Sequence, residues 1–408
     1  MQRMLSHMRR FALPLVFVSG VVLTIAVLVL LPRVNSVLSS HQQNFEEVKE
    51  LTGTTWTFQE YSDYFRKLSE DKGAEYAFKV LRVAPFPPGI DLHLLAHVVG
   101  EMLYKQKGIA AIAICTDDFR NACSHTVVIG ILLEHGEGSL PEIAETCKKA
   151  PGGKGAYNLC FHGLGHGVLA YTGYDFEKSI EMCKKVGTKE HNDREYIECV
   201  GGSSMEMMAG VHDRQAWEAQ KGKYFKEDDP LAPCDASFMP REAQPICYIH
   251  LTPHLFQAVG ADLRNPTPKN FKDAFAYCNA LSEDDDLLRN ACYGGFGKEF
   301  IVIARGKDVR DIGASRTDEL QKTVDWCALA NDTLGEKACQ SSALASLFWG
   351  GENTPDASFG FCALTTGEFQ TACYTQLAGQ VQFYSTDPAK KADLCKRLPE
   401  QYQTQCNR

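Results

Sequence analysis

Sixteen cysteines constrain this chain more than any other feature, because they fall along the sequence as eight neighbouring pairs. Within a pair the two cysteines are 8 to 16 residues apart. The pairs are Cys115/Cys123, Cys147/Cys160, Cys183/Cys199, Cys234/Cys247, Cys278/Cys292, Cys327/Cys339, Cys362/Cys373 and Cys395/Cys406. No Cys-x-x-Cys occurs, so the zinc-ribbon, thioredoxin and c-type haem motifs are missing. In an exported chain this pattern predicts a disulfide framework, whereas in a cytosolic chain it would mean buried free thiols.

The N-terminal region contains a long apolar run. Residues 11–31, FALPLVFVSGVVLTIAVLVLL, are 21 residues without a charge. A helix of that length spans about 30 Å, the thickness of a bilayer core. Arg9 and Arg10 precede the run, so the positive-inside rule predicts a cytoplasmic tail over 1–10 and an extracytoplasmic body. We therefore expect a single-pass membrane protein with a juxtamembrane linker over 32–50. A cleaved signal peptide is the alternative, and it also exports the body.

The composition and net charge limit the kinds of partner that the chain is expected to bind. Hydrophobic residues make up 44% of the chain and charged residues 23%, which is typical of a globular body. The formal net charge is −9, and no long basic run occurs beyond the N-terminus. Because phosphate binding needs clustered lysine and arginine, we expect no nucleic-acid partner.

The second cysteines of the pairs mark a repeat. They are spaced by 37, 39, 48, 45, 47, 34 and 33 residues, which is typical of two-helix solenoid units. In each unit we expect one helix to end near the first cysteine and the next to start near its partner. Nearest-neighbour pairing is the simplest of the connectivities that the sequence leaves open. The predicted fold is an all-α solenoid of disulfide-stapled hairpins over 91–408, preceded over 51–90 by a cap of two short helices that break near Gly73.

This layout resembles the Sel1-like and tetratricopeptide-type helical repeats. Cys115 and Cys123, with TDDFRNA between them, have the C-x7-C spacing of secreted cysteine-rich Sel1 relatives, and the other pairs are wider. The resemblance implies a helical superhelix with one disulfide across each inter-helix turn, and it implies no particular ligand. The segment CFHGLGHG, a C-x-H-G-x-x-H-G motif, also resembles uncharacterised bacterial membrane-anchored proteins.

Five histidines in the first repeats are the candidate metal ligands. His93 and His97 are four residues apart, as are His162 and His166, so each pair shares one face of a helix. His125 and His162 each follow a repeat-marking cysteine by two residues, which gives them equivalent positions in adjacent units. We expect these imidazoles to converge at one end of the concave face. Neutral imidazole suits a divalent transition metal such as Zn, Cu or Fe.

Other side chains are weaker candidates. Glu101 and Glu134 are possible auxiliary ligands or general bases. His135 lies in EHGEG and is expected to be a solvated helix end. His250 and His254 repeat the four-residue spacing, but the intervening Pro253 favours a structural role.

Two further functions compete with metal binding. The first is a protein–protein interaction scaffold that binds a protein or peptide on its concave face and has structural histidines only. The second is a metal-dependent enzyme with an open coordination position. The sequence contains no His-Glu-x-x-His, Gly-x-Ser-x-Gly, Walker or Rossmann motif that would name a reaction.

Overall fold

The computed structural model describes residues 45–116, 118–150, 154–187, 194–349 and 353–408, and all the regular structure in these residues is helical. The described residues fall into two units, 45–52 and 53–408. The first contains only α2 (Glu46–Leu51). The predicted tail 1–10 and membrane span 11–31 lie outside the described residues, as does most of the linker 32–50. Within the described residues, no helix combines the length and apolar character needed to cross a bilayer.

The second unit begins with the two helices expected ahead of the first cysteine, α3 (Phe58–Lys72) and α4 (Ala74–Val83), which break at Gly73 with φ 93°. Its remaining α-helices are α5 (Leu92–Lys107), α6 (Ala122–His135), α7 (Leu140–Cys147), α8 (Lys154–Tyr171), α9 (Phe176–Cys183), α10 (Arg194–Ala209), α11 (Arg214–Tyr224), α12 (Ala232–Asp235), α13 (Gln244–Ala258), α14 (Pro268–Asn279), α15 (Asp286–Ala304), α16 (Thr317–Cys327), α17 (Thr333–Phe348), α18 (Asp356–Leu364), α19 (Gly367–Tyr384), α20 (Pro388–Arg397) and α21 (Glu400–Cys406). Short 3₁₀ turns are η1 (Gly108–Ala113), η2 (Asp118–Asn121), η3 (Glu137–Ser139), η5 (Ile312–Ala314) and η6 (Ala328–Ala330).

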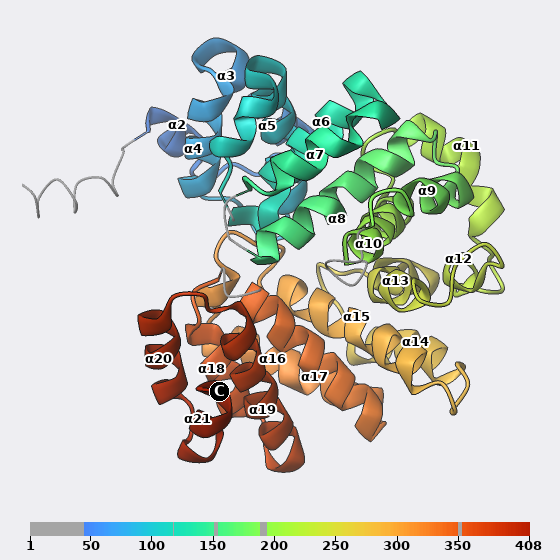
Figure 1. Cartoon of the computed structure of the whole chain (residues 1–408), viewed down its shortest axis with the longest axis vertical. Helices are drawn as coiled ribbons and strands as arrows, with labels where there is room; N and C mark the ends of the chain where they lie inside the picture. The colour runs from blue at the N-terminus through green and yellow to red at the C-terminus, as the bar shows by residue number, and fades with distance from the viewer. Residues whose placement is uncertain (1–44, 117, 151–153, 188–193, 350–352) are drawn as a thin grey trace, which may run out of the picture. The chain divides into compact units, whose positions relative to one another are not determined.

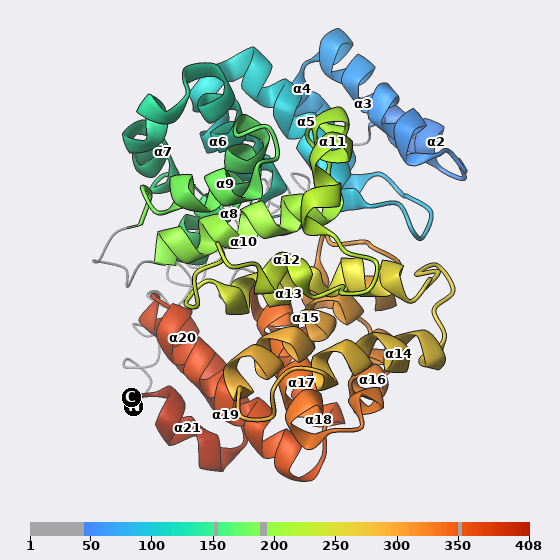
Figure 2. The same cartoon turned by 90° about the vertical axis from the view of Figure 1, so that its right-hand side faces the viewer.

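The helices of this unit form two layers. In the inner layer α5, α6, α8, α10, α13, α15, α17, α19 and α21 pack against one another in chain order. The outer layer contains α7, α9, α12, α14, α16, α18 and α20, each packed on the inner helix that follows it. Figure 1 shows this succession as a colour gradient from blue α3 to red α20, and Figure 2 shows the same helices from the side. The helical-repeat architecture expected from the cysteine spacing is therefore present.

All sixteen cysteines form disulfides between nearest neighbours, as the simplest pairing predicts, and none is free. The Cα atoms of the paired cysteines lie between 5.3 and 5.7 Å apart. The bonds are Cys115–Cys123, Cys147–Cys160, Cys183–Cys199, Cys234–Cys247, Cys278–Cys292, Cys327–Cys339, Cys362–Cys373 and Cys395–Cys406. The first begins just after η1, and the other seven tie an outer helix, at or near its end, to the next inner helix.

One detail of the hairpin units differs from the prediction. We expected each inner helix to start near the second cysteine, but several of these cysteines lie one or two turns inside the helix. Cys160 of α8, Cys247 of α13 and Cys292 of α15 lie six, three and six residues after the first residue of their helix. After Cys278, near the end of α14, the chain runs through the loop 280–285 and enters α15 at Asp286. Cys292 lies about 9 Å further along this helix. The disulfide therefore joins the end of an outer helix to the side of an inner helix rather than to its start.

The apolar core lies between the two layers. In the centre of the chain Phe256 of α13 and Phe300 of α15 contact Phe271 of α14, with ring centroids 5.6 and 4.6 Å from it. All three rings are fully or almost fully buried. The outer helices therefore hold the inner helices by apolar contact as well as by disulfides.

The solenoid closes on itself, which the sequence did not predict. The Gly89 backbone N–H donates to the Gly306 carbonyl (2.7 Å), so the segment after α4 meets the segment after α15. The Trp349 indole N–H donates to Asn121 Oδ1 (2.9 Å), which joins the end of α17 to the start of α6. The expected concave groove is consequently a central cavity of about 510 Å³ lined by the inner helices.

Reduction should unfold the second unit. Each disulfide closes a loop of 8 to 16 residues, and such closures contribute about 3 kcal/mol each. We expect the full chain to lose its helical circular-dichroism signal in a thiol reductant at a temperature where the oxidised chain keeps it. Thiol counting of the denatured, unreduced protein should find almost no free thiol. A native protein with most of its thiols free would contradict this fold.

Candidate metal centre

Seven histidines form one contiguous cluster at the N-terminal part of the inner layer. Five are those that the sequence singled out, and two are additional. They are His93 and His97 of α5, His125 of α6, His162 and His166 of α8, His212 after α10, and His250 of α13. Each ring has a neighbouring histidine ring with its centroid at 4.7 to 5.7 Å. His97, His125, His162, His166 and His250 are buried, with at most 6% of each exposed.

Glycines bring the histidine-bearing helices together. At Gly163 of α8 an added Cβ would lie 2.6 Å from the Cα of His125 on α6. At Gly202 of α10 it would lie 1.8 Å from the carbonyl oxygen of His162 on α8. Real Cβ atoms do not approach backbone this closely, so only glycine permits the spacing. His125 and His162, which hold equivalent repeat positions, consequently have ring centroids 5.7 Å apart.

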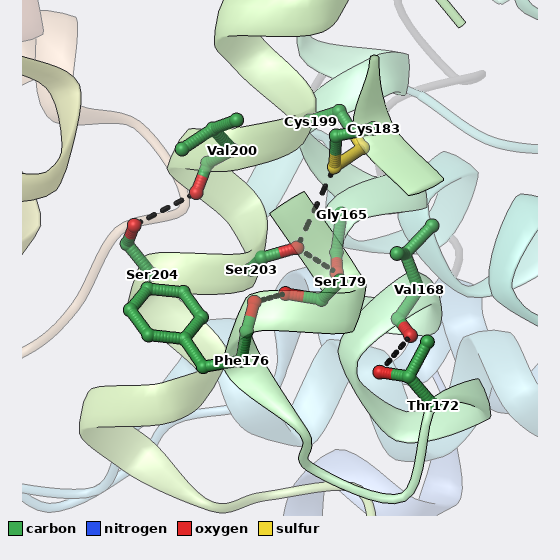
Figure 3. Close-up of a disulfide and its surroundings, with 10 residues drawn as sticks. All are labelled: Gly165, Val168, Thr172, Phe176, Ser179, Cys183, Cys199, Val200, Ser203 and Ser204. Atoms are coloured by element: carbon green, nitrogen blue, oxygen red, sulfur yellow. Dashed lines mark hydrogen bonds between the residues drawn. A yellow bond between two sulfur atoms is a disulfide. The ribbon is translucent and has the colours of Figure 1, made fainter. Parts of the chain in front are cut away.

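Gly165, inside the His-Gly-x-x-His-Gly segment, lies at the contact between α8 and α10. At this position an added Cβ would lie 2.0 Å from the carbonyl oxygen of Cys199 on α10. The hydroxyl of Ser203 donates to the Gly165 carbonyl at 2.9 Å and lies beside the Cys183–Cys199 disulfide (Figure 3). The disulfide and the close helix contact therefore meet at one point, which fixes how α8 sits against α10.

The first group of possible ligands is His93, His97 and His125, each of which offers a nitrogen within 4.8 Å of the others. The Nδ1 of His93 lies 2.7 Å from the carbonyl oxygen of Phe119, an acceptor, so Nδ1 carries the proton and Nε2 a lone pair. That Nε2 lies 3.2 Å from the Nε2 of His97. The Nδ1 of His97 has no hydrogen-bond partner.

The second group is His166, Glu206 and His212, whose ligand atoms also lie within 4.8 Å of one another. Glu206 is fully buried, and its Oε2 lies 3.0 Å from His166 Nδ1. Its Oε1 accepts hydrogen bonds from the Tyr174 hydroxyl and from the backbone N–H groups of Val211 and His212. Burial alone would raise the pKa of Glu206, but His212, His166 and Tyr174 lower it to about 2. The ionised carboxylate orients His166 so that its Nε2 faces the Nε2 of His162 at 3.4 Å.

Burial and neighbouring charges keep four histidines of the cluster in the form that binds metals. Burial, together with the charge of neighbouring histidines, lowers the pKa of His97, His125 and His162 well below the ordinary value of 6.5. Burial also lowers the pKa of His93, to about 4. These rings are therefore neutral at pH 7, and neutral imidazole is the ligand form.

The two auxiliary carboxylates lie outside both groups. Glu101 pairs with Lys105 (2.7 Å) and Arg66 (3.3 Å) on the partly exposed side of α5. Glu134 is exposed and accepts a hydrogen bond from the Tyr104 hydroxyl (2.6 Å). His135 is exposed at the end of α6, as expected.

His250, for which the sequence favoured a structural role, lies beside the predicted histidines. Pro253 does not interrupt α13, which runs from Gln244 to Ala258. Proline leaves the carbonyl of Ile249 without its helical N–H, and this carbonyl faces Gly295, where a Cβ would lie only 2.7 Å away. The helix continues through Pro253, and the His250 ring centroid lies 4.9 Å from that of His162. His212 and Glu206 carried no periodic signal that could have identified them.

The cluster borders the central cavity. His93, His125, His162 and His250 contribute to its lining, and much of the remaining lining is apolar, from Leu94, Leu159, Met205, Met208, Ile249 and Ile303. A small molecule in the cavity would therefore contact imidazoles directly.

Comparison with protein-family models, curated proteins and solved structures found no match for this chain.

Because α8 and α10 are in close contact at Gly202, one methyl group added there should lower the stability of the fold. Gly202→Ala should lower the free energy of unfolding by about 1–3 kcal/mol, because its Cβ meets the His162 backbone. The matched control is Gly379→Ala within α19, where no atom lies within 4 Å of the added Cβ; it should be neutral or stabilising by up to about 1 kcal/mol. Guanidinium unfolding with intact disulfides measures both. Equal midpoints for the two variants would show that the packing of α8 on α10 is not tight.

Proposed function

We propose that this protein is a membrane-anchored extracytoplasmic helical-repeat protein that binds a transition-metal ion through its histidine cluster. The supporting observation is that buried imidazole nitrogens face one another without other partners, at 3.2 Å between His93 and His97 and at 3.4 Å between His162 and His166. Two lone pairs at such distances repel unless a proton or a cation lies between them. A buried polar atom without a partner costs about 1–3 kcal/mol, and the Nδ1 of His97 is in that position.

The donor set favours Zn, Cu or Fe. Imidazole nitrogens bind these ions at about 2.0–2.1 Å. Hydrogen bonds from the outer nitrogens of His93 and His166 hold their rings in the required tautomer, which is the usual arrangement around a bound metal. The two groups together provide five imidazoles, enough for one ion or two, while Glu206 is the hydrogen-bond partner of His166.

The proposed location rests on two observations of different kinds. Eight disulfides suggest an oxidising, extracytoplasmic environment. The anchor rests on the apolar run 11–31 in the sequence.

A metal-dependent enzyme is the second candidate. It is favoured by the cavity of about 510 Å³ that borders the first histidine group. A catalytic ion keeps an open coordination position toward its substrate, whereas a purely structural ion has none. An interaction scaffold has less support, because a cavity of this volume fits a small molecule better than a folded partner.

Metal content tests the proposal. We expect the full-length chain, produced without a polyhistidine tag in an oxidising compartment, to contain about one or two equivalents of metal by elemental analysis. His93→Gln/His97→Gln should lose at least one equivalent, because it removes two facing nitrogens.

The control is His135→Gln, which removes an exposed imidazole outside the cluster and should keep the full metal content. A folded protein that contains no metal and gains no thermal stability from added Zn²⁺, Cu²⁺ or Fe²⁺ would contradict the proposal.

A further inference from the structure

Arg120 is an unpaired cation at the central cavity. The lining includes four basic side chains, and three of them have acidic partners there: Lys298 with Glu299 at 3.3 Å, Lys307 with Asp91 at 3.6 Å, and Arg194 with Glu198. Arg120, also in the lining, has no ion pair within the part of the chain that the structure describes. Its Nε and Nη2 are buried and have no hydrogen-bond partner.

The backbone that presents Arg120 is strained. Phe119, Arg120 and Asn121 all have positive φ, at 57°, 54° and 62°, in the left-handed region that L-residues rarely adopt. Trp349 also has a positive φ, 44°, and it lies beside Asn121 where the end of α17 meets the start of α6. Its indole lies 5.1 Å from the Arg120 guanidinium and donates to Asn121. Strain in consecutive residues persists where the surroundings impose it, and it is frequent at ligand sites.

The position of Arg120 places it near the histidines. Its positive charge contributes to lowering the pKa of both His93 and His250, after the larger effect of burial. A second cation, Lys298, contacts His250 Nδ1 at 2.9 Å. An anion bound by Arg120 would therefore lie at the end of the cavity that the imidazoles border.

We infer that the central cavity binds a small organic anion, with its oxyanion group on the guanidinium of Arg120 and its apolar body against the apolar lining. Arg120 lines the cavity and donates no hydrogen bond within the described residues, and a guanidinium in that position suits a carboxylate or a phosphate, which accept paired N–H groups. The apolar part of the lining, from Leu94, Leu159, Met208, Pro253, Val302 and Ile303, suits an aromatic or aliphatic body. This inference goes beyond metal binding and does not depend on it.

Calorimetric titration of the full-length chain with three probes of one shape tests the inference. The probes are 1-naphthoate, 1-naphthyl phosphate and the neutral 1-naphthalenemethanol, each titrated before and after chelation of metals. At least one anion should bind about tenfold or more tightly than the neutral probe, with and without metal. The tighter anion identifies a carboxylate or a phosphate ligand.

Arg120→Gln should abolish that preference, so that the anion binds about as weakly as the neutral probe. Arg120→Lys should keep part of the preference, because it keeps the charge but loses the paired N–H groups. Arg264→Gln removes the same charge from an exposed position and should change nothing.

Unchanged binding of 1-naphthalenemethanol by Arg120→Gln shows that the variant is folded. Equal affinity of the wild type for charged and neutral probes, or no binding of either anion at millimolar concentration, overturns the inference. An anion preference that disappears on chelation also overturns it, since the metal would then be the anion's ligand.

Discussion

Neighbouring inner helices touch at their half-cystines, where a glycine of one helix lies against the backbone of the next. Gly165 and Gly297 each follow the repeat-marking cysteine of their own helix by five residues. An added Cβ at Gly165 would lie 2.0 Å from the carbonyl oxygen of Cys199, and one at Gly297 would lie 1.8 Å from that of Cys339. The disulfides fix the outer helices at the same places. The helices therefore have one register in two distant parts of the solenoid, and side chains at equivalent positions lie side by side.

That register explains why the histidines converge. Rings two residues after a half-cystine, such as His125 and His162, must be neighbours because the glycines leave no space between their helices. Burying several polar rings costs free energy, and the Nδ1 of His97 has no hydrogen-bond partner. A bound cation would offset this cost, and the buried Glu206 supplies a compensating negative charge beside His166.

Local patterns in the sequence predicted the hairpin units, the nearest-neighbour disulfides and the convergence of five histidines, because each follows from spacing along the chain. Where an inner helix begins relative to its cysteine depends on the path of the preceding loop, and the prediction for Cys160 and Cys292 was wrong by almost two turns. The closure of the solenoid depends on contacts such as that of the Trp349 indole, which leave no periodic signal. His212 lies in a turn whose position is set by backbone hydrogen bonds to a buried carboxylate. The position of His250 beside His162 depends on the packing of α13 against α10, which the four-residue spacing around Pro253 does not reveal.

X-ray absorption spectroscopy of the metal-loaded full-length chain shows which atoms bind the ion. We predict a first shell of at least three nitrogens at about 2.0–2.1 Å, with the outer-shell scattering of imidazole rings. His93→Gln/His97→Gln should remove part of that scattering or the metal itself. A first shell of oxygen atoms without imidazole scattering would place the ion outside the histidine cluster and contradict the account.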